Sequence, residues 1–158
     1  PRIIVPLVAV IAKLWDFAIA LVILFGMMAY FGFAPTPEAL LLPAITLVMI
    51  LTAAGFGMWL TALALQYRDI QYSLAFGVQL LMYASPVVYS VSMVPERFRL
   101  LYNLNPMAGV IGAFRSVLLG TNPIPWQGLA VGACVALLLL LSGGAYFISM
   151  ERRFADVA

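Results

Sequence analysis

The chain of 158 residues is 65% hydrophobic and only 9% charged, with a mean hydropathy of +1.10 and a net charge of +2. This composition excludes a water-soluble domain, which needs far more polar surface, and indicates an all-α integral membrane protein. The chain has no histidine and a single cysteine, Cys134, which excludes an intrachain disulfide and counts against a zinc site.

Four long apolar segments are predicted to cross the membrane as helices, within one transmembrane domain that covers residues 1–158. Each has 19 residues or more, and a helix needs about 17–25 residues to cross a hydrocarbon core about 30 Å thick. The predicted spans are residues 7–33, 40–65, 73–91 and 129–150. In the first span, Lys13 and Asp16 share a helix face and can neutralise each other at the inner interface. The alternative is that they line a subunit interface or a path through the membrane.

Small residues at helical spacing predict close packing in two of these spans. In the second span, Ala53, Gly57 and Thr61 recur at every fourth position. At the start of the last span, Gly128 and Gly132 are also four residues apart. Such stripes let helix backbones approach each other in a membrane.

The third predicted span is interrupted at Pro86, and two short helices are predicted after it, at residues 94–102 and 106–119. Asn105 is a favoured N-cap, Pro106 suits the first helical position, and Gly120 suits a left-handed C-terminal cap. The second short helix is about 20 Å long and cannot cross the membrane. It is nonetheless apolar nearly all round, so we expect the pair to be re-entrant, with this helix buried in protein at membrane depth.

The distribution of arginines predicts the topology. With four spans, Arg2, Arg68, Arg152 and Arg153 fall on one side, which the positive-inside rule makes cytoplasmic. Both ends of the chain are then expected in the cytoplasm. A fifth span at residues 106–119 would place the last two arginines outside. The outward placement of three other arginines counts against the four-span topology, and Glu96 offsets part of this cost. These are Arg97, Arg99 and Arg115.

The sequence offers no chemistry of its own. No pairing of a nucleophile with a base, no paired carboxylates and no metal-ligand cluster can be assembled from it, so neither catalytic residues nor a metal site are predicted. It also contains no phosphate-binding P-loop, so any ATP hydrolysis must come from another subunit.

The segment LLMYASPVVYSVSMVPERFRLLYNLNPMAGVIGAFRSVLLG resembles the signature region of type-2 ABC exporter permeases for polysaccharides and polyol phosphates. The opening PRIIVP and the central YRDIQY also match the pattern of that family. Members of the family export O-antigen, capsule or teichoic-acid chains. The resemblance covers essentially the whole chain, and the order Ser85-Pro86, Pro95-Glu96, Asn105-Pro106 is its most specific part.

The resemblance implies a six-span permease that works as a homodimer in the cytoplasmic (inner) membrane. The chain, which starts at Pro1 rather than Met, is then expected to be a C-terminal fragment that holds spans three to six. Two ABC ATPase subunits would bind ATP and Mg²⁺, and the chain itself would need no cofactor and no nucleic acid. The cargo implied is a lipid-linked glycan. Membrane lipid is expected as a further partner.

Within this picture, four residues of the short helices are candidates for a gate. We expect Glu96, Asn105, Pro106 and Arg115 to belong to a lid at the outer mouth of the path. An isolated arginine at membrane depth must face protein, water or lipid phosphate, and Glu96 is the nearest acidic candidate to Arg115 in the sequence. The alternative is that Arg115 extends to the lipid headgroups.

Three tyrosines around the break are candidates for the substrate path, because aromatic faces suit sugar rings and a hydroxyl bonds sugar without adding charge. They are Tyr83, Tyr89 and Tyr102. The alternative is ordinary packing or an interfacial aromatic belt.

At the cytoplasmic turn, Arg68 and Asp69 are candidates for contact with the ATPase. The alternative is that they anchor the turn at the membrane–water interface.

Other classes of membrane protein remain as alternatives. A type-2 ABC exporter of a drug, lipid or other small amphiphile would share the fold. A secondary transporter or channel would need coupling-ion sites or inverted repeats. A structural membrane anchor would not need two short helices between spans.

Overall fold

A computed structural model describes residues 4–87, 89, 91–120 and 122–155, and in these ranges the chain is helical without strands. The all-α membrane fold predicted from the sequence is therefore confirmed. The elements are α1 (Ile4–Tyr30), η1 (Pro37–Leu41), α2 (Leu42–Gln66), α3 (Ile70–Ala84), η2 (Val91–Met93), α4 (Glu96–Asn103), α5 (Pro106–Leu119) and α6 (Trp126–Ala155).

Within the described ranges, three helical stretches are long and apolar enough to cross a membrane: Leu7–Tyr30, Pro37–Gln66 and Trp126–Arg152. Helix α3 differs from the predicted span at 73–91, because it begins at Ile70 and ends after 15 residues. The cause is Pro86, which pushes the residue before it out of helical geometry; Ser85 has φ −101° and ψ 148°. At about 22 Å, α3 is shorter than the hydrocarbon core, and the four-span topology stays a prediction.

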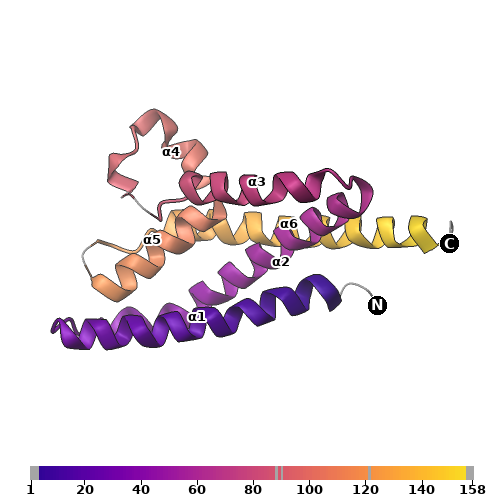
Figure 1. Ribbon diagram of the computed structural model, residues 1–158. Helices are drawn as coiled ribbons and strands as arrows, with labels where there is room; N and C mark the ends of the chain where they lie inside the picture. Colours follow the sequence, from indigo (N-terminus) through magenta and orange to yellow (C-terminus); the bar gives the residue numbers. More distant parts are fainter. Residues whose placement is uncertain (1–3, 88, 90, 121, 156–158) are drawn as a thin grey trace.

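The helices run back and forth between two ends of the molecule (Figure 1). The start of α1, the turn between α2 and α3, and the end of α6 lie at one end, with the loop after α1, α4 and the turn before α6 at the other. Arg68 and Arg152 are therefore at the same end, as the topology argument requires. Arg2 and the side chain of Arg153 lie outside the described residues, and which end faces the cytoplasm stays a prediction.

Helices α2 and α6 pack with their backbones almost in contact. A Cβ on Gly55 would lie 2.6 Å from the backbone N of Leu140, and a Cβ on Gly143 would lie 2.7 Å from the carbonyl O of Gly55. Near their C-terminal ends, the two helices share a buried cluster of Met58, Ala62, Phe147 and Met150. This pair of spans is the rigid frame on which the other helices sit.

Helix α5 is wedged against this frame at the opposite end. Its residues Val110, Ala113 and Val117 are almost fully buried together with Ile45 of α2. The bounds of α5 are those predicted, and the prediction that it is buried in protein is confirmed. Because α5 hides much of its apolar surface inside the protein, a helix too short to cross the membrane can be stable there, and its depth in the membrane stays a prediction.

Helix α1 packs loosely on the bundle. Only Met28 of its described side chains is buried, and Phe17 meets Phe114 of α5 edge-on, with ring centroids 5.7 Å apart. Lys13 and Asp16 form the expected ion pair at 2.8 Å, and both side chains are exposed in this chain.

The small-residue stripe of α2 does not make the close contact that was predicted. Ala53, Gly57 and Thr61 line an apolar cleft of about 480 Å³ between α1 and α2, and a Cβ on Gly57 would meet nothing within 4 Å. The close approach is made instead by Gly55, on the face that α2 turns toward α6.

Candidate functional site

The site centres on the joint where α3 ends and α5 begins, and Asn105 holds the two helices together there. Its side-chain Oδ1 accepts a hydrogen bond from the backbone N of Met107 at 3.0 Å, so Asn105 is the N-cap of α5, as predicted. Its Nδ2 donates to the carbonyl of Ala84 at 3.3 Å and to the Oγ of Ser85 at 3.1 Å. One side-chain amide therefore caps the start of α5 and also donates a hydrogen bond to the last carbonyl of α3.

The start of α5 is seated against the backbone of α6 at two glycines. A Cβ on Gly109 would lie 2.4 Å from the carbonyl O of Gly128, and a Cβ on Gly132 would lie 3.0 Å from the carbonyl O of Pro106. The predicted packing role of Gly128 and Gly132 is thus confirmed, with α5 as the partner. Pro106 stands at the first helical position and is buried. Since Gly132 is six residues into α6, the start of α5 lies about 9 Å along that helix from its first residue.

Arg115 binds the irregular segment that follows α3. Its Nη1 donates to the carbonyl of Tyr89, and its Nη2 donates to the carbonyls of Pro86 and Val87, each at 3.1 Å. These carbonyls lack helical partners because the chain leaves the helix at Ser85. A guanidinium offers several donors in one rigid plane, so its two terminal nitrogens can reach all three carbonyls at once.

The expected pairing of Arg115 with Glu96 is wrong. Glu96 accepts instead from Arg99 of its own helix, at 3.5 Å, and both side chains are well exposed. The reason is local geometry, because residues three apart in a helix are neighbours, whereas Arg115 is held by backbone carbonyls of the break. The alternative of Arg115 extending to lipid headgroups does not hold either, since its side chain is engaged within the protein. We call the bonds made by Asn105 and Arg115 the α3–α5 latch.

The three candidate tyrosines lie together beside this latch. The hydroxyl of Tyr89 donates to the carbonyl of Tyr83 at 3.1 Å, and the rings of Tyr89 and Tyr102 are 6.1 Å apart between centroids. The Tyr102 hydroxyl oxygen is buried and has no hydrogen-bond partner among the residues that the structure describes. Burial raises the pKa of this hydroxyl above its ordinary value, the neighbouring Tyr89 hydroxyl raises it further, and Arg115 opposes the effect. At neutral pH, Tyr102 therefore presents an uncharged hydroxyl.

Comparison with known proteins decides the family. A family model described as ABC-2 type transporter matches residues 7–119, well over half of the chain. The chain belongs to the ABC-2 type transporter family.

Curated relatives of this ABC-2 chain share one description, "O-antigen export system permease protein RfbA". One from Klebsiella pneumoniae and one from Myxococcus xanthus are each 23% identical to it. A second K. pneumoniae relative is 22% identical. Each alignment covers 99% of this chain and 61% of the relative. The chain therefore spans about three-fifths of the length of these relatives.

The turn between α2 and α3 carries the two residues predicted to meet a partner of the ABC-2 protein. Arg68 and Asp69 are both exposed, and Asp69 precedes α3 without capping it through its side chain. The contact itself stays a prediction.

Among the described residues, no group of three or more His, Cys, Asp or Glu side chains could hold a metal ion.

An aromatic and polar network near the C-terminal ends of α2 and α6 of the ABC-2 chain was not predicted. Trp59 of α2 stacks on Tyr146 of α6, with ring centroids 4.7 Å apart, and donates from Nε1 to the Oγ of Ser142 at 3.0 Å. Tyr146 in turn donates to Oε1 of Gln66 at 2.8 Å. The sequence does hold one signal of this, since Gly143 leaves room for the Trp59 ring, which a Cβ there would meet at 2.8 Å.

Proposed function

We propose that this chain is the membrane-spanning part of an ATP-driven exporter that moves lipid-linked polysaccharide or polyol-phosphate polymer out across the cytoplasmic membrane. The observation that carries the proposal is the match, along 99% of the chain, to relatives that are each described as O-antigen export permeases. The family match agrees with it, because it gives a transport protein of the ABC-2 type. The chain is then a transport subunit rather than an enzyme.

The partners follow from the same proposal. ATP and Mg²⁺ would be bound by an ABC ATPase subunit on the cytoplasmic side, where Arg68 and Asp69 would meet it. Two copies of the permease would form the path, and both ends of this chain would be cytoplasmic. The location of the turn and the end of α6 at one end of the bundle supports this arrangement (Figure 1).

The geometry of the latch suits an outer gate. Helix α3 begins at the proposed ATPase contact and ends at Asn105 and Arg115, which tie it to the buried helix α5. The tyrosines beside the latch offer aromatic faces and neutral hydroxyls, which suit a sugar chain better than an apolar drug. Glu96 and Pro106 would belong to the same gate, at the starts of its two short helices.

A second candidate cargo is a drug, lipid or other small amphiphile, exported by the same fold. The apolar cleft between α1 and α2 favours it, because that cleft of about 480 Å³ would take an acyl chain or an aromatic ring.

The test is export by the full-length permease, co-expressed with its ATPase in a host that makes the lipid-linked glycan but lacks an exporter. Surface glycan, measured with a membrane-impermeant label, should appear, and the lipid-linked precursor inside should fall. An ATPase variant that binds but does not hydrolyse ATP is the control. Restored efflux of a hydrophobic dye without surface glycan would assign the cargo to the amphiphile class instead.

A further inference from the structure

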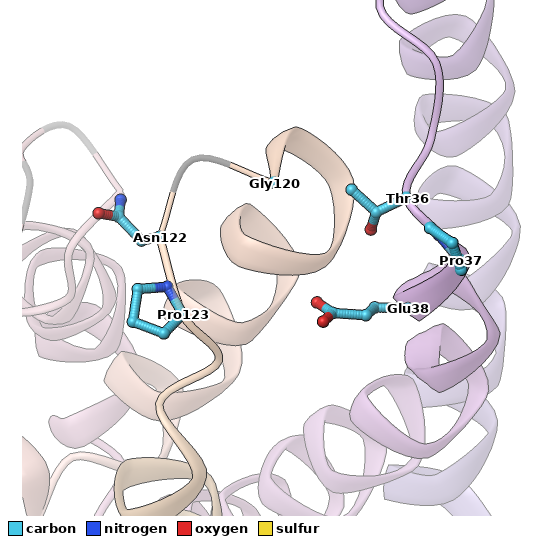
Figure 2. Close-up of a pocket in the computed structure, with 6 residues that line it drawn as sticks. All are labelled: Thr36, Pro37, Glu38, Gly120, Asn122 and Pro123. Atoms are coloured by element: carbon cyan, nitrogen blue, oxygen red, sulfur yellow. The ribbon is translucent and has the colours of Figure 1, made fainter.

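A cavity of about 600 Å³, open to the surface, lies between the loop after α1 and the turn before α6, apart from the latch. Its lining residues come from two distant parts of the sequence: Thr36, Pro37, Glu38, Gly120, Asn122 and Pro123. Figure 2 shows Glu38 pointing into the space beside the end of α5, with Asn122 and Pro123 on the far side. Neither the family match nor the candidate gate assigns a role to this cavity.

The cavity exists because the loop after α1 docks on the C-terminus of α5. The hydroxyl of Thr36 donates to the carbonyl of Val117, and its methyl group lies where a Cβ on Gly120 would come within 2.8 Å. Gly120 has φ +62°, so both its conformation and its space require glycine. Thr36 thereby fixes η1, which starts at Pro37 and carries Glu38 in its first turn.

Two sources of negative charge lie beside the cavity. One is the C-terminal end of the α5 dipole, although the carbonyls of Ser116 and Val117 already accept from the backbone N of Gly120 and the hydroxyl of Thr36. The other is Glu38, whose full charge forms no ion pair or hydrogen bond among the described residues. No lysine or arginine lines the cavity, and Figure 2 shows the Asn122 amide turned away from Glu38. The site therefore favours a cationic group that donates hydrogen bonds.

The size and level of the cavity identify the ligand class. A volume of about 600 Å³ far exceeds what a bare ion needs, since one water occupies about 30 Å³. A single carboxylate is also poor for Ca²⁺ or Mg²⁺, which favour several oxygen ligands with more charge. The exposed Trp126 begins α6 just after the turn, which is typical of the headgroup level of a membrane.

We propose that this cavity binds the primary ammonium headgroup of a phospholipid of the phosphatidylethanolamine type. The ammonium, with three N–H donors, would pair with Glu38 beside the negative end of the α5 dipole. A choline headgroup has the same charge but no N–H donor, so it should bind more weakly. The lipid would then hold the loop after α1 against the end of α5.

The test is native mass spectrometry of the full-length permease complex in detergent, titrated with phosphatidylethanolamine or phosphatidylcholine of identical chains. The wild type should retain phosphatidylethanolamine preferentially, and Glu38→Gln should lower that preference roughly fivefold, as for an exposed charge pair. Glu38→Asp should keep most of it. Glu96→Gln is the matched control, because Glu96 is an exposed acid of α4 that pairs with Arg99 and does not line the cavity.

Each outcome decides the proposal. Loss of the preference in Glu38→Gln but not in Glu96→Gln supports it. An equal retention of both lipids by the wild type, or a preference that survives Glu38→Gln, overturns it. Free ethanolamine is added in a second series: if it alone is retained through Glu38 and neither lipid is, the ammonium comes from a soluble amine and the lipid assignment is wrong. Thermal unfolding of each variant shows that the fold is intact.

Discussion

Asn105 shows how one side chain serves two helices, and its two functions can be separated. Asn105→Asp keeps an oxygen that can cap α5 but removes the Nδ2 that donates to Ala84 and Ser85. Asn105→Ala removes both and should cost roughly 1 kcal/mol of stability through the cap alone. We therefore expect Asn105→Asp to loosen the end of α3 while α5 stays folded.

The measurement is hydrogen exchange of both helices in the full-length protein. Faster exchange is expected in the last turn of α3 for both variants, but in the first turn of α5 only for Asn105→Ala. Uniform acceleration across both helices in Asn105→Asp would show that the two functions are not separable.

Tyr102 carries a buried hydroxyl that has no partner among the described residues, which is a cost to folding unless a group outside them uses it. Tyr102→Phe removes only that oxygen, so stability should be unchanged or rise by up to about 1 kcal/mol. If the hydroxyl binds the glycan, export should nevertheless fall. Truncation to Ala at Tyr83, Tyr89 and Tyr102 should also lower export while assembly with the ATPase persists.

Surface glycan and the thermal unfolding midpoint are measured on the same preparations. The outcome that removes the path hypothesis is wild-type export from Tyr102→Phe and from all three Ala variants. The tyrosines would then serve packing alone.

At the scale of elements, the seat of α5 on α6 depends on the lack of a side chain at Gly109. Gly109→Ala would place a methyl group 2.4 Å from the carbonyl O of Gly128. The two backbones must then separate, and we expect a loss of about 1–3 kcal/mol. Gly26→Ala is the control, since a Cβ there meets nothing within 4 Å in this chain. Thermal unfolding in detergent compares the two; an equal shift of the midpoint would contradict the backbone contact.

The lid hypothesis predicts how accessible α5 is from outside. Ala108 and Ala113 are 5% and 0% exposed, so single cysteines there should label slowly with a membrane-impermeant reagent. Cys134 is exposed and must be replaced first. Labelling should rise with Arg115→Ala, which frees the segment after α3, but not with Arg97→Ala, whose guanidinium lies over the ring of Phe98.

A cysteine at Leu104, which is 57% exposed beside the latch, is the positive control and should label quickly. Free labelling at Ala108 and Ala113 in the resting wild type, or labelling from the cytoplasm only, would refute the lid.

The elements themselves were largely predictable because their signals are local. The cap residues Asn105, Pro106 and Gly120 define α5 within a few residues of sequence, and its bounds follow from them. The interruption of the predicted span 73–91 lies at Ser85-Pro86, and α3 does end there, at Ala84, because a proline acts on the residue before it.

Contacts between distant residues could not be predicted. Nothing in the sequence indicates that Arg115 would bind carbonyls 26 to 29 residues away rather than an acid. The same holds for the cavity at Glu38, which exists only because Thr36 reaches Val117, 81 residues further along the chain.

For the whole molecule, coupling to ATP hydrolysis is expected to pass through the turn between α2 and α3. Reversing both charges, with Arg68→Glu and Asp69→Lys, should lower ATPase stimulation by the permease without lowering membrane insertion. The physical reason is that both side chains are exposed and contribute little to folding here. ATPase activity is measured in proteoliposomes. The matched control is Arg97→Glu, a charge reversal at an exposed residue of α4, at the opposite end of the bundle. Unchanged stimulation in the reversed double variant would leave only interfacial anchoring for these residues.

The way in which helix α3 is attached to the bundle affects how it can transmit motion. None of its 15 residues is buried in this chain, so it is joined to the bundle mainly at its two ends, by the turn at Arg68 and by the latch. An α-helix of about 22 Å is stiff over that length. If the proposed function holds, a push on the turn would reach Asn105 with little loss, because no residue of α3 is buried against the other described elements. A stiff α3 that slides would displace the latch by the same distance as the turn, whatever the identity of its outward side chains.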